Sequence, residues 1–259
     1  MTHSGQSMRH ALPRAETVDR VAFLEWVASG RRVVHVGFWG TEGCRELMEP
    51  HALWLHERLA KKAATLIGLD VNEEGVDQAR REGYEAYVVD CQDQEAVRAL
   101  CLDPAEVVLA GEVIEHIDAP GRFLDAMHEL AVPGGSLVIT TPNAYSMLNS
   151  LSAFRGLELI NPDHVALYSW YTLTNLLKRH GWETTSFLTY PYPLAPGSAS
   201  GRGRLGKLLA RLVLGIQGVL SRTVAPFIAH GLIAVGQESS RDGRDMASST
   251  SEASVPTPG

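Results

Sequence analysis

Short apolar runs alternate with amphipathic segments along most of this chain, which is the pattern of a parallel α/β sheet. Periodic apolar and polar positions between the runs predict helices, and glycine or proline closes several of them. The sequence therefore predicts an α/β fold with a doubly wound sheet and helices on both faces. The predicted strands are 32–37, 65–71, 86–89, 106–110, 136–141, 183–190 and 231–236, and the predicted helices are 16–28, 50–63, 73–82, 94–100, 120–130 and 172–180.

The ends of the chain differ from its middle in composition. Residues 1–14 lack a periodic pattern, so we expect a flexible N-terminus, and 238–259 is rich in Ser, Asp, Arg and Pro, which predicts a disordered tail. A single domain is expected over 15–237. Within it, 191–229 is predicted to be a lid or an amphipathic helical insertion, because loop-forming residues precede a long helical repeat.

The helical repeat in that insertion combines apolar and basic residues. Apolar residues recur at helical spacing over 205–220, and no acid occurs between residues 184 and 237. Three interpretations stay open: a helix packed over the sheet, a peripheral membrane contact through 202–222, or a homodimer contact. The basic residues are Arg202, Arg204, Lys207, Arg211 and Arg222.

Composition and charge narrow the range of partners. The chain has 259 residues, 45% of them hydrophobic, and a formal net charge of -7. This acidic balance argues against a nucleic-acid substrate and favours a small molecule or a glycan. Cys44, Cys91 and Cys101 are odd in number and form no Cys-x-x-Cys pair, so we expect free thiols. The N-terminus lacks a secretory signal, and we expect a cytoplasmic protein.

Acidic residues stand at the ends of two predicted strands. Asp70 ends the second strand, Asp90 follows the third, and Gly37 ends the first. Carboxylates placed in this way can bind the ribose and base of a nucleoside. A nicotinamide dehydrogenase is the competing interpretation, but residues 37–40 (Gly-Phe-Trp-Gly) do not form Gly-x-Gly-x-x-Gly, and the chain has no Tyr-x-x-x-Lys pair.

A second polar cluster follows the fourth strand. Residues 111–117 read Gly-Glu-Val-Ile-Glu-His-Ile, so Glu112, Glu115 and His116 share one face if the chain is helical there. The acids of such a face can simply cap a helix and shape a pocket. Together with an imidazole, they can also bind a divalent metal ion.

The order of these motifs resembles that of the class I S-adenosylmethionine-dependent methyltransferases, in particular the branch with the ubiquinone-pathway O-methyltransferases. The resemblance covers about 18–190 and resumes at the last strand. It is carried by 68–71 (Gly-Leu-Asp-Val), 111–117 and 133–143 (Pro-Gly-Gly-Ser-Leu-Val-Ile-Thr-Thr-Pro-Asn). It implies a Rossmann-like sheet of seven strands, mostly parallel with an antiparallel last strand, and S-adenosylmethionine across the strand tips.

The resemblance also implies roles for single residues. Gly37 would approach the methionine part of the cofactor, Asp70 would hold the ribose, Asp90 would meet the adenine, and the Gly111 carbonyl would accept from the ammonium. The neighbouring Phe38, Val71 and Cys91 are assigned to the same site. The family usually has an acid and then three alternating glycines in the first loop, whereas this chain has His35, Gly37, Trp39 and Thr41.

The Glu-x-x-Glu-His pattern further resembles the metal site of small-RNA 2′-O-methyltransferases, in which a later histidine completes the ligand set. His164 stands in that place here. Glu112, Glu115, His116 and His164 are therefore the expected ligands of Mg²⁺, Mn²⁺ or Zn²⁺. Glu115, His116 and His164 are the expected catalytic residues, and without a metal either histidine would be the general base.

The sequence thus predicts an S-adenosylmethionine-dependent methyltransferase that acts on a hydroxyl of a small molecule or sugar, with or without a divalent metal. The alternative is a non-catalytic protein that binds S-adenosylmethionine or serves as a scaffold, because its first loop departs from the family pattern.

Overall fold

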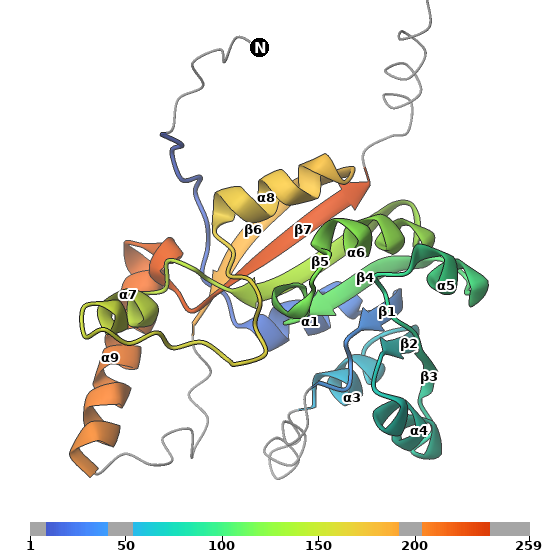
Figure 1. Cartoon of the computed structure of the whole chain (residues 1–259), viewed down its shortest axis with the longest axis horizontal. Helices are drawn as coiled ribbons and strands as arrows, with labels where there is room; N and C mark the ends of the chain where they lie inside the picture. The colour runs from blue at the N-terminus through green and yellow to red at the C-terminus, as the bar shows by residue number, and fades with distance from the viewer. Residues whose placement is uncertain (1–8, 41–53, 192–203, 239–259) are drawn as a thin grey trace, which may run out of the picture.

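The computed structural model describes residues 9–40, 54–191 and 204–238, with the backbone alone over 204–211. A seven-stranded sheet in the order β3-β2-β1-β4-β5-β7-β6 forms its centre (Figure 1). β7 is antiparallel to both of its neighbours, and the other pairs are parallel. The predicted fold is confirmed. The strands are β1 (Arg32–Val36), β2 (Thr65–Asp70), β3 (Glu85–Val88), β4 (Ala105–Gly111), β5 (Ala131–Pro142), β6 (Trp182–Tyr190) and β7 (Gly231–Glu238).

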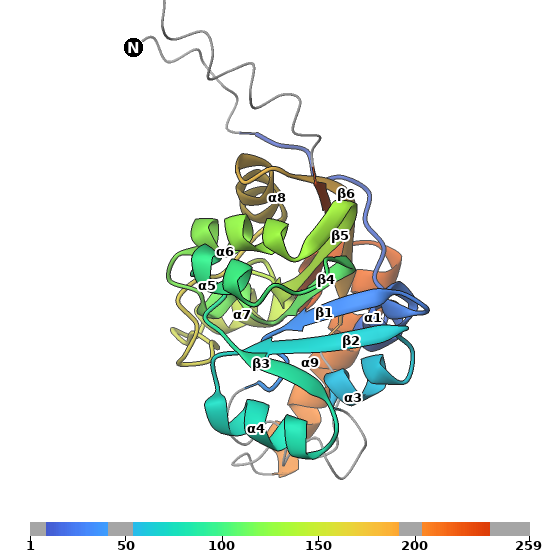
Figure 2. The same ribbon diagram turned by 90° about the vertical axis from the view of Figure 1, so that its right-hand side faces the viewer.

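Helices cover both faces of this sheet (Figure 2). The α-helices are α1 (Arg20–Ala28), α3 (Leu55–Ala60), α4 (Glu73–Arg81), α5 (Gln94–Ala99), α6 (Pro120–Ala126), α7 (Met147–Ala153), α8 (Trp170–Arg179) and α9 (Arg204–Thr223). Short 3₁₀ turns within the described residues are η2 (Ile114–His116), η3 (Met127–Glu129) and η4 (Pro226–Ile228).

The continuous apolar runs of the central strands divide their side chains between two cores. In β4, Val108 packs with α5, α6 and α8, whereas the adjacent Val107 and Leu109 pack with α1 and α3. This alternation follows from the two-residue period of a strand, and it explains why the central strands have apolar residues at nearly every position.

Side-chain caps fix where several helices begin. The Asn72 side chain accepts from the Gly75 amide at the start of α4, and the Asp93 side chain accepts from two amides at the start of α5. Ser169 and Thr172 form a reciprocal capping box at α8. Each cap fixes the point at which the chain leaves a loop and enters a helix.

Two elements differ from the sequence prediction. β5 begins at Ala131 rather than 136, because the Pro133-Gly134-Gly135 segment forms an irregularity within the strand instead of a turn before it. The sequence pattern does not predict α7, which Ser146 caps and which packs against α9. The N-terminal part of the predicted helix 50–63 and the predicted disordered tail beyond 238 lie outside the described residues.

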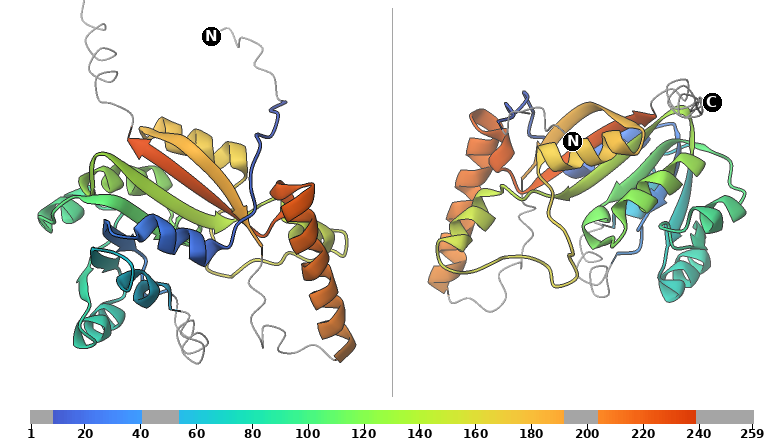
Figure 3. Two further views of the ribbon diagram at one scale, coloured as in Figure 1. Left: turned by 180° about the vertical axis from the view of Figure 1, so that it is seen from behind. Right: turned by 45° about the horizontal axis from the view of Figure 1, so that its top comes forward.

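α9 stands apart from the layers on the sheet. Figures 1 and 3 show α7 and α9 side by side at one end of the molecule, with the long axis of α9 leading away from the strands. The segment before α1 runs along β6, since Thr17 pairs with Thr189 and the Thr17 hydroxyl donates to the Ser221 carbonyl of α9 at 2.6 Å. The N-terminal segment therefore links the edge of the sheet to the C-terminal end of α9.

Two buried histidines meet beneath the first strand. His35 of β1 and His56 of α3 are 2% and 0% exposed, and their Nδ1 atoms lie 3.2 Å apart. Burial lowers the pKa of His56 to about 3, and burial and the neighbouring His56 lower the pKa of His35 as well. Both imidazoles are thus neutral in the folded protein at neutral pH.

We predict that this pair makes the free energy of unfolding fall as the pH drops below about 6.5, because the unfolded chain binds protons there and the folded chain does not. Each histidine contributes a slope of ~1.4 kcal/mol per pH unit. His56→Leu should remove one of the two contributions. Urea unfolding at a series of pH values measures the slope, and an equal slope in wild type and variant would contradict this account.

Candidate active site

Four strand ends form one rim of the sheet. β3, β2, β1 and β4 are parallel neighbours, so Asp90, Asp70, Gly37 and Gly111 follow one another along the same edge. Gly37 has a φ of +66°, and a Cβ there would lie 2.3 Å from Cγ2 of Val113. The chain can turn this closely beside the β4 end only because residue 37 has no side chain.

Asp70 joins the ends of β1 and β2. One carboxylate oxygen accepts from the Trp39 amide at 2.9 Å, and the other accepts from the Asn72 amide at 3.0 Å. Burial raises the pKa of Asp70, and these amides act in the opposite direction. The next side chain, Val71, is 65% exposed. The predicted cofactor edge thus pairs an anchored carboxylate with an uncovered apolar side chain.

Asp90 and Cys91 continue the rim beyond β3. Asp90 is exposed, and its carboxylate accepts from the backbone amide of Gln92 at 2.9 Å. Cys91 is 6% exposed, and burial raises the pKa of its thiol to about 12. The thiol therefore stays protonated and forms part of an apolar wall.

Trp39, the bulky residue of the unusual first loop, turns its ring onto α4. A Cβ at Gly75 would lie 2.4 Å from this ring, and the Trp39 and Trp54 rings meet edge to face at 5.6 Å between centroids. The missing side chain at Gly75 makes room for the indole. Phe38 is 3% exposed and packs with Trp54 and α4, so its ring belongs to the core.

The prediction that Glu112, Glu115 and His116 share one helix face is wrong, because Glu112 lies outside the helical turn. It adopts a φ of +59°, and only Ile114–His116 forms a turn of 3₁₀ helix. Its carboxylate accepts from the hydroxyls of Thr140 at 2.9 Å and Tyr190 at 2.6 Å. The Arg20 Nε lies 3.9 Å from the same oxygen and donates to Thr140. This network engages the Glu112 carboxylate with residues of α1, β5 and β6.

The remaining three predicted ligands come together. One donor atom from each of Glu115, His116 and His164 lies within 4.8 Å of the others. Glu115 is 0% exposed; its Oε2 accepts from Thr141 at 2.9 Å, and its Oε1 is buried without a hydrogen-bond partner. The Nδ1 of His164 is also buried without a partner. Such atoms are unfavourable unless a ligand or ion satisfies them.

The electrostatics of the cluster follow from this burial. Burial, and secondly the Glu112 charge, raise the pKa of Glu115 to about 8. Burial and the neighbouring His116 lower the pKa of His164. His116 Nδ1 lies 3.1 Å from the Asp163 carbonyl, which fixes the ring and leaves Nε2 as its free nitrogen. At neutral pH the cluster holds a neutral His164 imidazole. A nearby cation would stabilise the charged form of the Glu115 carboxyl group beside it.

Backbone hydrogen bonds bring His164 to β4. The amides of Val165 and Ala166 donate to the Glu115 carbonyl at 2.8 and 3.2 Å, and Asn143 pairs with Tyr168. The segment after α7 is therefore held against the η2 turn.

Arg20 is a rim residue that the sequence prediction misses. Its Nη2 would lie 2.9 Å from a Cβ at Gly111, and its side chain is 23% exposed. It occupies the first position of α1, far along the chain from every motif, so only the packing of α1 against the strands reveals it. Its charge suits a carboxylate at the place predicted for the methionine part of the cofactor.

The fold is that of a class I S-adenosylmethionine-dependent methyltransferase. Residues 49–186 match the family described as "Methyltransferase domain", more than half of the chain, and the chain belongs to this family. It is 29% identical over 168 residues to a ubiquinone biosynthesis O-methyltransferase of Xylella fastidiosa (strain M23). That match covers 63% of this chain and 59% of the relative, so the chain spans less than two thirds of the relative's length.

Solved structures show the same fold. A SAM-dependent methyltransferase from Thermotoga maritima superposes with a TM-score of 0.53 at 14% identity, over 84% of this chain and 87% of that one. Magnesium protoporphyrin IX methyltransferase from Synechocystis, solved with bound S-adenosylhomocysteine, gives 0.50 at 13% identity, over 85% of this chain and 80% of that one.

We predict that Gly75→Ala weakens S-adenosylmethionine binding about tenfold, because the added methyl group displaces the Trp39 ring and with it the amide that donates to Asp70. In a Trp39→Ala background the same substitution should have little effect, since the space is then free. Calorimetric titration of the four proteins measures the coupling, and equal effects of Gly75→Ala in both backgrounds would refute it.

Proposed function

We propose that this protein transfers the methyl group of S-adenosylmethionine to a hydroxyl oxygen of a small molecule or sugar, with a divalent metal held by Glu115, His116 and His164. The observation that carries the proposal is the meeting of these three side chains at the end of β4, next to the predicted cofactor rim. The name of the Xylella relative, an O-methyltransferase, supports transfer to oxygen.

The residues of the rim fit the cofactor. Asp70 would hold the ribose, the exposed Val71 would cover one side of the adenine, and Asp90 would meet the amino group of that ring. Arg20 and the Gly111 carbonyl would hold the carboxylate and the ammonium of the methionine part. S-adenosylmethionine supplies an electrophilic methyl group, so the protein has to position the acceptor oxygen and remove its proton.

The cluster fits a divalent ion because it contains buried ligand atoms that have no hydrogen-bond partner. Oε1 of Glu115 and Nδ1 of His164 are buried without a hydrogen-bond partner, and His116 offers Nε2 while its other nitrogen meets a carbonyl. Three protein ligands with open positions are typical of catalytic metal sites. An ion there would lower the pKa of an acceptor hydroxyl, which could then attack near neutral pH.

A general base provides the same deprotonation if the cluster holds no ion. The lowered pKa of His164 keeps its imidazole neutral and able to accept a proton. His116 packs edge to face with it, with 4.6 Å between ring centroids, and is the second candidate. The metal-assisted and the general-base mechanism both place the acceptor hydroxyl at this cluster. The same residues are therefore proposed to act with or without a metal.

We predict that the protein binds S-adenosylhomocysteine and S-adenosylmethionine, and that Asp70→Asn weakens both about tenfold by removing the charged ribose acceptor. Isothermal titration measures the affinities, and mass spectrometry of a metabolite extract measures gains of one methyl group. Failure to bind either compound would contradict the proposal that the protein is a methyltransferase. Binding without turnover on any extract would favour the non-catalytic alternative.

We further predict that Mn²⁺ binds the protein and that His164→Gln and Glu115→Gln each weaken this binding about 100-fold, because each removes one of three ligands. Glu115→Gln keeps the hydrogen bond from Thr141 and the shape of the residue. Asp125→Asn is the matched control, since this carboxylate pairs with His180 at 2.8 Å outside the cluster, and its loss should leave Mn²⁺ binding unchanged.

Titration of Mn²⁺ followed by electron paramagnetic resonance measures these affinities directly. Full turnover in the presence of a chelator would contradict the metal-assisted mechanism. If His164→Gln also loses turnover, the result supports His164 as the general base.

A further inference from the structure

Exposed apolar side chains gather at the end of the molecule formed by α7, the segment that follows it, and α9. Phe154 is 90% exposed, Val219 62% and Leu212 58%. We call this surface the α7–α9 face; its central residues are Leu151, Phe154, Leu157, Leu212, Ile216 and Val219. Large exposed apolar side chains on neighbouring elements are typical of a surface that binds a partner or a membrane.

Two polar side chains of α9 face inward. Gln217 and Ser221 are 1% and 0% exposed; Gln217 donates to the Ile228 carbonyl at 2.7 Å, and Ser221 to the Gly218 carbonyl. Leu212, Ile216 and Val219, spaced four and three residues apart, occupy the opposite, exposed side of the helix. A surface helix of a globular protein shows the reverse arrangement, so the outer side of α9 is suited to an apolar environment.

The sequence of α9 is basic although the whole chain is acidic. The net charge is -7, yet residues 184–237 contain five basic residues and no acidic one. Four of the five, Arg204, Lys207, Arg211 and Arg222, belong to α9. A second copy of the chain would bring cations against cations, whereas an anionic bilayer surface complements them.

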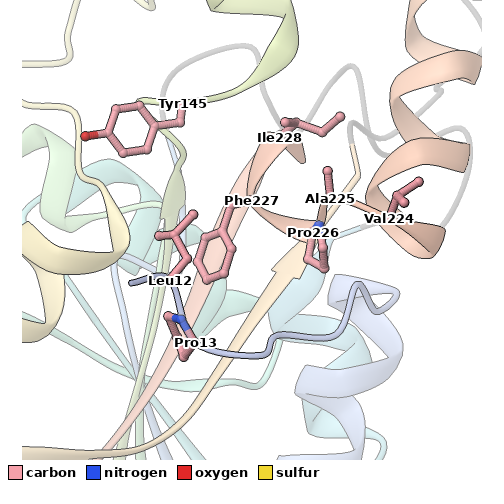
Figure 4. A pocket seen from close by; sticks show the side chains of 8 residues that line it. All are labelled: Leu12, Pro13, Tyr145, Val224, Ala225, Pro226, Phe227 and Ile228. Atoms are coloured by element: carbon pink, nitrogen blue, oxygen red, sulfur yellow. The ribbon is translucent and has the colours of Figure 1, made fainter. Parts of the chain in front are cut away.

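An apolar cavity of about 460 Å³ lies at the C-terminal end of α9 (Figure 4). It is lined by Leu12 and Pro13 of the N-terminal segment, Tyr145 after β5, and residues 224–228. Gly231, three residues beyond, pairs with Pro142 at the end of β5. The cavity therefore lies close to the ends of β5 and β7 that this pair joins.

We propose that the α7–α9 face docks on an anionic lipid bilayer, with the apolar side of α9 in the interfacial region and its basic residues at the lipid headgroups. Apolar burial and attraction to anionic lipids together give peripheral binding. Among the described residues, no helix has the length and apolarity to cross a membrane. Docking of this kind would bring the apolar cavity at the C-terminal end of α9 close to molecules held in the bilayer. The docking proposal does not depend on which atom accepts the methyl group.

Co-sedimentation of the full chain with vesicles tests this proposal. Vesicles of phosphatidylcholine mixed with phosphatidylglycerol should bind the protein, pure phosphatidylcholine should bind it much less, and high salt should weaken the binding. The double substitution Leu212→Glu and Val219→Glu should reduce binding about tenfold or more. Trp26→Glu is the matched control, because Trp26 is 68% exposed in a helix outside this face and should have no effect.

S-adenosylhomocysteine affinity, measured on each variant, shows whether its fold is intact. Equal vesicle binding by the double variant and the control would overturn the proposal. So would a protein that ignores vesicles and forms a dimer that the double substitution dissociates, since the face would then serve a second copy.

Discussion

The turn after β4 depends on the carboxylate of Glu112, which holds the chain in a conformation that glutamate rarely adopts. A left-handed backbone costs roughly 1–3 kcal/mol, and hydrogen bonds from Thr140 and Tyr190, with Arg20 beside them, offset this cost. The turn has two effects. It directs Glu112 toward α1, β5 and β6, and it lets Glu115 and His116 face His164 on the other side. The two acids thereby have different hydrogen-bond partners, although the Glu112 charge still raises the pKa of Glu115.

The arrangement of strands is readable from the sequence because buried parallel strands leave continuous apolar runs. The residues at their ends, Gly37, Asp70, Asp90 and Gly111, can accordingly be assigned to one rim from the pattern alone. Glu112 cannot, for a physical reason: its partner Tyr190 lies 78 residues away, and no local pattern indicates that contact. The same reason hides α7 and the inward-facing Arg20, since tertiary packing decides both.

The unusual first loop shows how a departure from a family pattern can be compensated. Trp39 stands where the family resemblance implies a glycine, but Gly75 leaves room for its ring, and the Trp39 amide donates to Asp70. In the sequence, the tryptophan looks like an obstacle at the cofactor site. In the fold its ring packs with Phe38, Trp54 and α4, beside the space that Gly75 leaves.

The central claim is that Glu115, His116 and His164 form the reaction centre beside the cofactor rim, with Glu112 serving the fold. A crystal structure of the protein grown with S-adenosylhomocysteine and Mn²⁺, with anomalous scattering recorded for manganese, tests it most directly. The account predicts one manganese peak bound by Glu115, His116 and His164, with the ribose of S-adenosylhomocysteine on Asp70. A manganese site built on Glu112, or a cofactor bound away from Asp70 and Gly111, would contradict it.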